Sequence, residues 1–254
     1  MNLLKRFSLE VYRVTKVLPL CWLLRWLCCL LLRMPQVVLK KSLGPVDDAF
    51  GTQFSVKQNG KLLKFDSCAF GVVREIFGAE CYGGAESFSG LNTIVDFGAN
   101  AGVFTIFALG SDSGIKVTAV ETQPELIDAL NRNLKANHFE ERCTVVNAFV
   151  GDATTEWANQ FRSEHPAIKS LDVGRFFENL DKIDFLKCDI EGAEFSLFSD
   201  ALEWSSKIMR MSIEYHWNRE DGMHLETLIR NLGFQTQLKD HGSLGYVIAD
   251  RNQI

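Results

Sequence analysis

The stretch that decides the fold reads Thr93-Ile-Val-Asp96-Phe-Gly98-Ala-Asn100-Ala-Gly102-Val-Phe-Thr105. A short apolar run, a glycine-rich turn and the apolar start of a helix follow one another, which is typical of a buried parallel strand that leads into a helix. Gly98 has no Cβ, so the turn can bring its backbone close to a ligand. Asp96 can anchor loop amides or a ligand ammonium, and Asn100 tolerates turn geometry.

The spacing of this loop separates two classes of cofactor. Dinucleotide sites use G-x-G-x-x-G to seat a pyrophosphate at a helix N-terminus, whereas this loop reads D-x-G-x-N-x-G. An acid leads the loop and Asn100 replaces a glycine. The pattern therefore disfavours a nicotinamide dehydrogenase and favours a cofactor with a cationic aminoacyl end and no phosphate. The simpler alternative is an ordinary strand–helix turn in which Asp96 caps the helix.

The rest of the chain alternates strand and helix patterns. The expected strands are Thr93–Phe97, Ile115–Val120, Cys143–Phe149, Ile183–Asp189, Lys207–Tyr215, Phe234–Lys239 and Leu244–Ala249. The expected helices are Val103–Leu109, Pro124–Asn137, Val173–Leu180, Glu194–Leu202 and Asp221–Leu232. This order predicts an α/β fold with a mostly parallel sheet and helices on both faces. Ligands of such sheets bind beyond the carboxyl ends of the strands.

Two shorter regions precede the sheet. Residues 1–44 read as a basic and apolar helical segment, with a helix over 3–33 that bends near Pro19 and stops at Met34-Pro35. Residues 45–90 contain an Asn59-Gly60 hairpin signal between short strands and a helix near Phe70–Phe77. We expect residues 91–254 to form the cofactor-binding domain.

Composition limits the function classes. The 254 residues carry a net charge of −5, and 46% of them are hydrophobic. Residues 1–41 are basic, so the remainder is acidic and a poor general binder of nucleic acid. The seven cysteines form no C-x-x-C pair, which favours reduced thiols in the cytoplasm over a disulfide framework or a zinc site.

Polar residues gather where the predicted strands end. Glu121, after the second strand, can accept hydrogen bonds from both ribose hydroxyls of a cofactor, or it can cap the following helix. Lys187, Asp189 and Glu191 alternate along the fourth strand and share one face, so the lysine can offset repulsion between the two carboxylates. Glu194 falls in the next helical turn, where a structural role is as plausible as a functional one.

The fifth strand adds a histidine to this set. Glu214 and His216 share one face of that strand, which we expect to lie beside the strand carrying Asp189. A histidine titrates near neutrality and suits a general base. We therefore expect one cleft that holds the carboxylates and His216, with a hydrogen-bonded structural histidine as the alternative.

Three segments resemble the FkbM family of methyltransferases: Val95-Asp-Phe-Gly-Ala-Asn-Ala-Gly102, Phe185-Leu-Lys-Cys-Asp-Ile-Glu-Gly-Ala-Glu194 and Ile213-Glu-Tyr-His216. The resemblance covers about residues 66 to 235. It implies a seven-stranded Rossmann-like class I methyltransferase sheet with an antiparallel final strand. It also implies methyl transfer from S-adenosylmethionine, usually to a hydroxyl oxygen of a sugar, a lipid-linked glycan or a polyketide.

The resemblance assigns roles residue by residue. Cofactor-binding residues would be Asp96, Gly98, Ala99, Asn100, Gly102, Glu121, Ala148 and Asp189. The expected base is His216, held by Glu214, with Glu191 as the second candidate. No metal is assigned. One rival is a metal-assisted O-methyltransferase in which Asp189, Glu191 and His216 hold a hard cation. Another is a non-catalytic protein that binds the cofactor.

The N-terminal segment suggests a peripheral membrane contact. Val17–Leu32 is apolar but shorter than a membrane span, and it contains Arg25. Trp22 and Trp26 share one helical face, and basic residues flank the run. We expect residues 1–41 to lie on an anionic membrane surface on the cytoplasmic side. The alternative is packing on the catalytic domain or on a second subunit. The acceptor and the oligomeric state are not specified by the sequence.

Overall fold

The computed structural model describes residues 3–152, 155–199, 201–216, 218–240 and 244–251, and the chain forms two compact units. Unit 1 comprises Met1–Ser89, Ala101–Ser113 and Asp128–Glu141. Unit 2 comprises Gly90–Asn100, Gly114–Ile127 and Arg142–Ile254. The division differs from the predicted domains 1–44, 45–90 and 91–254, because Ala101–Ser113 and Asp128–Glu141 of the predicted cofactor-binding domain belong to unit 1.

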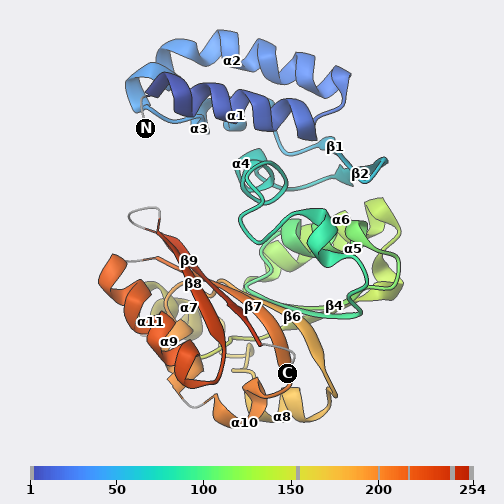
Figure 1. Ribbon diagram of the computed structural model, residues 1–254. Coiled ribbons are helices and arrows are strands. Elements are labelled where there is room, and N and C mark those ends of the chain that lie inside the picture. The colour runs from blue at the N-terminus through green and yellow to red at the C-terminus, as the bar shows by residue number, and fades with distance from the viewer. Residues whose placement is uncertain (1–2, 153–154, 200, 217, 241–243, 252–254) are drawn as a thin grey trace. The chain divides into compact units, whose positions relative to one another are not determined.

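Unit 1 begins with three helices, α1 (Leu3–Val17), α2 (Leu20–Lys40) and α3 (Gly44–Phe50), drawn in blue in Figure 1. The predicted break near Pro19 is present between α1 and α2. The predicted stop at Met34-Pro35 is wrong, because α2 continues through Pro35 to Lys40. A proline inside a helix costs roughly 3 kcal/mol. Burial of Trp26, Leu30 and Val37 along α2 is the opposing gain.

The hairpin predicted at Asn59-Gly60 is confirmed. Strands β1 (Phe54–Gln58) and β2 (Lys61–Phe65) pair antiparallel, and Asn59 and Gly60 have φ values of 48° and 74°. Two consecutive positive φ values are what a two-residue hairpin turn of type I′ requires. The chain continues through α4 (Phe70–Val73), a π-helical turn (Arg74–Gly78) and a 3₁₀ turn (Ala85–Phe88).

Side-chain hydrogen bonds explain why α5 (Val103–Ser111) and most of α6 (Pro124–Asn137) belong to unit 1. Gln58 of β1 donates from Nε2 to the carbonyl of Phe107 at 2.9 Å. Asn133 of α6 is fully buried, donates to the carbonyl of Ala101 at 2.8 Å and accepts from the amide of Asp66 at 2.8 Å. Buried amide side chains need such partners, so these bonds fix the two helices to the hairpin region.

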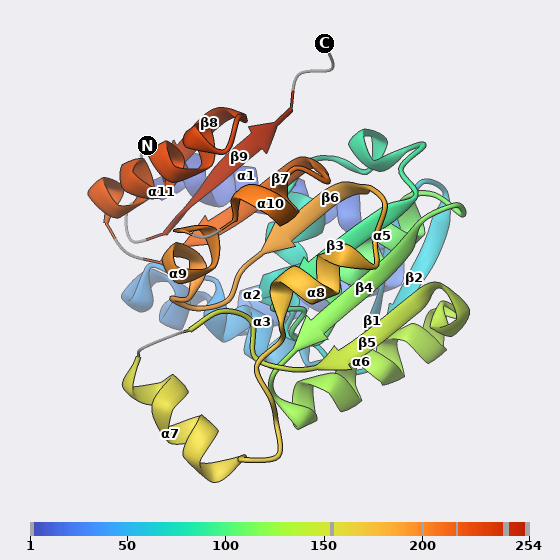
Figure 2. The same ribbon diagram turned by 90° about the horizontal axis from the view of Figure 1, so that it is seen from below.

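Unit 2 is built on a seven-stranded sheet in the order β5-β4-β3-β6-β7-β9-β8. Its strands are β3 (Thr93–Phe97), β4 (Lys116–Glu121), β5 (Cys143–Asn147), β6 (Ile183–Cys188), β7 (Ile208–Tyr215), β8 (Gln235–Asp240) and β9 (Gly245–Asp250). The five neighbouring strands β5, β4, β3, β6 and β7 run parallel to one another. Strand β9 lies antiparallel to both β7 and β8. The predicted Rossmann-like sheet is therefore confirmed, including its antiparallel final strand (Figures 1 and 2).

The remaining elements are the 3₁₀ turn Glu140–Arg142 and the helices α7 (Glu156–Glu164), α8 (Val173–Glu178), α9 (Glu194–Ser199), α10 (Leu202–Ser205) and α11 (Arg219–Asn231). Helix α7 was not predicted, because its segment reads as a short polar linker. Thr155 begins it by accepting a hydrogen bond from the amide of Ala158 at 3.2 Å, as an N-cap residue does.

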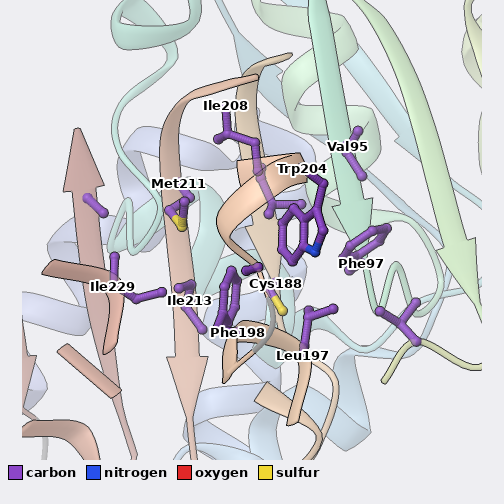
Figure 3. Close-up of a cluster of buried hydrophobic side chains, with 14 of the residues drawn as sticks. Val95, Phe97, Cys188, Leu197, Phe198, Trp204, Ile208, Met211, Ile213 and Ile229 are labelled. Atoms are coloured by element: carbon purple, nitrogen blue, oxygen red, sulfur yellow. The ribbon is translucent and has the colours of Figure 1, made fainter. Parts of the chain in front are cut away.

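A buried apolar cluster joins one face of the sheet to α8, α9, α10 and α11 (Figure 3). Sheet residues of the cluster include Phe97, Cys188 and Ile213 at the carboxyl ends of β3, β6 and β7. Rings of Phe177 and Trp204 stack at 4.8 Å beneath them. Because side chains alternate along a strand, the neighbouring polar residues Asp96 and Lys187 face the opposite side.

Candidate active site

Three parallel strands bring the predicted polar residues to one edge of the sheet. Phe97 of β3 pairs with Cys188 of β6, and Cys188 pairs with Ile213 of β7. The chain segments that follow these residues therefore emerge side by side. The expectation that the Glu214 strand lies next to the Asp189 strand is confirmed.

The glycine-rich loop is held by backbone contacts on both sides. The amides of Gly98 and Ala99 donate to the carbonyl of Val120 at the end of β4, both at 3.0 Å. A Cβ on Gly98, which has a φ of 74°, would lie 1.7 Å from the carbonyl oxygen of Asp189. Glycine is thus required here for backbone packing in the protein itself. A larger residue at position 98 would disturb folding before it tested ligand binding.

Glu121 is nearly buried and organises the adjacent turn. One carboxylate oxygen accepts from the amide of Asn100 at 2.8 Å, and the other accepts from the amides of Thr122 and Gln123 at 2.8 Å each. These three amides lie in the glycine-rich loop and in the turn before α6, so Glu121 orders that turn and these bonds do not cap the helix itself. A carboxylate offers about four acceptor positions, so capacity for a ligand hydroxyl remains after these three bonds.

A cavity of about 110 Å³ opens at this edge of the sheet. The predicted residues Gly98, Asn100, Glu121, Ala148, Asp189 and Glu191 line it. Apolar groups of Val120, Leu126 and Val150 complete the wall. Asp96, Ala99 and Gly102 are predicted site residues outside this lining. Ala99 is buried, and a Cβ on Gly102 would lie 2.1 Å from Leu130 Cδ1 of α6, so position 102 has no room for a side chain.

Lys187 neutralises two carboxylates below the cavity. Its Nζ atom lies 3.3 Å from Asp96 Oδ1 and 3.6 Å from Asp189 Oδ2, and it donates to the carbonyl of Gly98 at 2.5 Å. Both Lys187 and Asp96 are buried. Burial alone would lower the pKa of Lys187, but Asp96, Asp189 and Glu214 outweigh it and raise that pKa above its ordinary value. The expected pairing of Lys187 with Asp189 is confirmed, and its second partner is Asp96, where the sequence had suggested Glu191.

Asp189 and His216 form a hydrogen-bonded pair. His216 Nε2 lies 2.9 Å from Asp189 Oδ1. This bond is the main reason why the pKa of His216 is raised to about 9. Burial lowers that pKa, and the negative charges of Asp189, Glu191 and Glu214 raise it further. Burial would raise the pKa of Asp189, yet Lys187 and His216 together hold it below its ordinary value. The pair is thus a carboxylate and an imidazolium near neutral pH.

The two other expected catalytic carboxylates, Glu191 and Glu214, are not placed as the sequence suggested. Glu191 has a φ of 53°, so it leaves the strand geometry that we assumed, and 71% of its side chain is exposed. Its Oε2 atom lies 3.9 Å from His216 Nε2. Glu214 contributes an oxygen that lies within 4.8 Å of ligand atoms of Asp189 and His216. His216 is hydrogen-bonded to Asp189, where we expected Glu214 to hold it.

Glu194 supports the turn between β6 and α9. Its carboxylate accepts from the amides of Ile190 and Gly192, both at 3.0 Å, and the side chain is fully buried. Burial raises the pKa of Glu194. These bonds satisfy amides in the segment that carries Asp189 and Glu191, so the structural role of Glu194 is the one observed.

Helix α7 supplies cavity residues that we did not expect. Ala158 and Arg162 both line the cavity. The Arg162 guanidinium lies 4.8 Å over the ring of Phe149 and donates to the carbonyl of Gly151 at 3.1 Å. The available sequence signal was Thr155 as an N-cap, with Ala158, Phe161 and Arg162 at helical spacing after it.

A larger cavity of about 650 Å³ also lies in unit 2, among α8, α9 and α10. Ser170, Phe177, Trp204 and Lys207 are among its lining residues, and none of the predicted site residues is. Ligands of open α/β sheets bind beyond the carboxyl ends of the strands. That rule favours the smaller cavity, where the carboxylates and the glycine loop meet.

Comparison with known protein families identifies this arrangement. The Methyltransferase FkbM domain matches residues 96–236, which is more than half of the 254 residues. The chain belongs to the FkbM methyltransferase family. The match begins at Asp96 and spans β3 to the start of β8, so this FkbM methyltransferase carries the whole candidate site within the family domain. Among curated proteins, none matches the chain.

Solved structures resemble this FkbM methyltransferase at low identity. The METTL16 MTase domain is 15% identical with a TM-score of 0.48, over 66% of this chain and 64% of that one. An O-methyltransferase family protein from Burkholderia thailandensis is 13% identical with a TM-score of 0.44, over 65% and 52%. Aeropyrum pernix fibrillarin, in complex with S-adenosyl-L-methionine, is 12% identical with a TM-score of 0.46, over 78% and 82%. The chain thus spans less than two thirds of the first two, and their ligands and acceptors are not carried over to it.

Proposed function

We propose that this FkbM methyltransferase transfers a methyl group from S-adenosylmethionine to a hydroxyl oxygen of an acceptor. A sugar, a lipid-linked glycan or a polyketide-type molecule is the acceptor class we favour. The observation that carries the proposal is the His216–Asp189 pair beside the carboxylate-lined cavity. A hydroxyl must lose a proton during methylation, and a carboxylate-oriented imidazole is suited to accept it.

The donor chemistry of the cavity supports the cofactor. S-adenosylmethionine carries a cationic aminoacyl end, ribose hydroxyls and an apolar adenine. Glu121, Asp189 and Glu191 offer acceptors, and Val120, Leu126 and Ala148 offer apolar contact. The cavity volume of about 110 Å³ is below the roughly 300 Å³ at which small-molecule pockets begin. Binding therefore requires widening, for which a shift of α7 with Ala158 and Arg162 is our candidate.

The residues of the chain have three tasks in this proposal. The bound cofactor supplies a methyl group that is already activated on its sulfonium. Acceptor alignment is then the main requirement on the protein. His216 takes the hydroxyl proton, with Asp189 orienting the ring through Nε2. Lys187, whose ammonium lies 3.6 Å from Asp189 Oδ2, keeps Asp189 ionised. Glu191 is the second candidate base.

A metal-assisted reaction is the leading alternative. Ligand atoms of Asp189, Glu214 and His216 lie within 4.8 Å of one another and could surround a cation. The third ligand in this set is Glu214, whereas the sequence suggested Glu191. The Lys187 ammonium, 3.6 Å from Asp189, already supplies positive charge there and opposes a second cation. We therefore expect activity to persist after dialysis against a chelator, and loss of activity that a divalent ion restores would favour the metal-assisted reaction.

The proposal is tested by product detection. Purified protein is incubated with S-adenosylmethionine labelled at the methyl group and with panels of glycan, lipid-linked and small hydroxylated acceptors. We expect label in an alkali-stable ether of one acceptor class. Binding of the cofactor without transfer to any acceptor would favour the non-catalytic alternative. Label on nitrogen or carbon would contradict the oxygen acceptor, and transfer to nucleic acid would contradict the expectation from the acidic charge balance. We place this activity in the cytoplasm.

A further inference from the structure

Helix α2 has an inward face that packs within unit 1. Trp26 is fully buried, and Leu30 and Val37 are 6% and 7% exposed. Trp22 lies edge-on to Phe50 of α3, with 6.0 Å between the ring centres. Both tryptophans thus belong to the packed side of α2. Trp26 is unavailable to a membrane because it is buried in unit 1, and Trp22 is half-buried against Phe50.

The opposite face of α2 is apolar and exposed. Leu20, Leu24, Leu31 and Val38 are 71%, 55%, 73% and 60% exposed. Their spacing of four and seven residues places them along one line of the helix. Leu32 and Leu39, at 80% and 83%, form a second row beside that line. Single exposed leucines are ordinary on protein surfaces, but a continuous apolar stripe marks an interaction site.

A basic band borders this leucine face. Arg25, Arg33 and Lys40 are exposed on α2, and no acidic residue occurs between Glu10 and Asp47. The Arg25 guanidinium lies 5.3 Å over the ring of Trp22 and 5.5 Å over that of Phe50, which holds its charge at the flank of the helix. An apolar stripe with cations along its side is the pattern of a helix lying in an anionic membrane interface.

We propose that α2 binds the surface of an anionic lipid bilayer. The leucine face, defined as Leu20, Leu24, Leu31, Leu32, Val38 and Leu39, enters the boundary between headgroups and acyl chains. The basic band, defined as Arg25, Arg33 and Lys40, lies at the level of the lipid phosphates. Each cation near such a surface adds to the attraction, and salt weakens it. The proposal concerns lipid binding and is independent of the methyl acceptor.

The same helix is long and apolar enough to cross a membrane, judged by length and composition alone. Two observations favour the surface position. Spanning would strip Trp26, Leu30 and Val37 from their packing in unit 1. It would also place Arg25 and Arg33 in the hydrocarbon region, which charged side chains avoid. A surface position leaves the packing intact and keeps both cations in contact with phosphate.

A second copy of the chain is a less suitable occupant of the leucine face. Pairing two α2 helices through this face would bring two basic bands toward one another. Neither band has an acidic residue within α2 to offset it. Like charges oppose such a contact, whereas anionic lipid complements them.

The test uses the full-length protein and sedimentation with vesicles. We compare neutral phosphatidylcholine vesicles with vesicles that contain roughly 30% phosphatidylglycerol, a share chosen to approximate an anionic surface. We expect binding to the anionic vesicles that falls as salt rises. The double variant Leu24→Gln/Leu31→Gln should bind at least about tenfold more weakly, because it removes apolar area from the interface. Leu62→Gln changes a 59% exposed leucine of β2 and is the matched control.

Further measurements distinguish binding at the lipid surface from membrane spanning and from dimerisation through the leucine face. Arg33→Gln/Lys40→Gln should weaken binding to anionic vesicles and leave the weak binding to neutral vesicles unchanged. Thermal unfolding of all variants should match the parent, since the altered side chains are exposed. The proposal would be overturned if the full-length protein did not bind anionic vesicles. It would also be overturned if the leucine-face variant bound them as strongly as Leu62→Gln does. Protein that resists extraction by alkaline carbonate, which indicates spanning, or a dimer in lipid-free solution that the leucine-face variant abolishes, would overturn it too.

Discussion

His216 Nε2 lies 2.9 Å from Asp189 Oδ1, although the two residues are 27 positions apart in the chain. The contact exists because β6 and β7 are parallel neighbours, and Cys188 at the end of β6 pairs with Ile213 near the end of β7. Lys187 approaches the second oxygen of the same carboxylate at 3.6 Å. Asp189 therefore contacts both the buried ammonium of Lys187 and the half-buried imidazole of His216. Its contact with His216 influences the charge state of the candidate base.

Removing the imidazole should affect turnover more than cofactor binding. We expect His216→Gln to lower the rate of methyl transfer by about 10²–10⁴-fold, which is the usual contribution of a positioned base. Cofactor affinity, measured by calorimetric titration, should change little because His216 lies outside the cavity lining. His224→Gln alters an exposed histidine of α11 and serves as control. Unchanged turnover in His216→Gln would make Glu191 the leading base.

The raised pKa of His216 predicts an alkaline activity profile. A base must be neutral, and a pKa of about 9 leaves roughly one molecule in a hundred neutral at pH 7. At low acceptor concentration, kcat/KM should rise nearly tenfold per pH unit and level off near pH 9. Asp189→Asn keeps an acceptor oxygen but removes the negative charge that strengthens this bond, so the pKa should fall and the rise should move toward pH 6.5 in the variant. A flat profile between pH 6 and 9 would argue against His216 as the base.

Lys187 should be required for stability. Replacing it with methionine leaves the buried Asp96 and the half-buried Asp189 without their shared cation. Breaking a buried ion pair from one side costs about 3–5 kcal/mol. We expect urea unfolding of Lys187→Met to show a loss of that size. Lys182→Met is the matched control, because Lys182 is 56% exposed and pairs with Asp184 at the surface. Equal losses in the two variants would contradict the assigned role.

Glu121 should link loop order to cofactor affinity. Its carboxylate accepts from three backbone amides, including that of Asn100. Glu121→Gln replaces one acceptor oxygen with a donor that faces those amides, so the loop loses part of its support. We expect cofactor affinity to fall by about tenfold or more in calorimetric titration. Glu125→Gln, at an exposed position in the first turn of α6, is the control. Equal affinity of Glu121→Gln and the parent would restrict Glu121 to ordering the turn before α6.

Several features of this protein follow from local sequence alone. The apolar run at Thr93–Phe97, the Asn59-Gly60 turn and the alternation of strands and helices were all predicted and confirmed. The sharing of one face by Lys187 and Asp189 was predicted as well. These features depend on residues that are close in the chain, where side-chain periodicity and turn conformation act directly.

Other features depended on contacts between distant segments. The sequence could not show that Asp189 is a hydrogen-bond partner of His216, because the register between β6 and β7 decides which side chains meet. It could not show that α2 continues through Pro35 or that Trp26 faces inward, because tertiary burial outweighs local preference. Sequence periodicity determined which side chains share a face, and tertiary packing decided what each face contacts, since burial energy depends on neighbours that the local sequence does not specify.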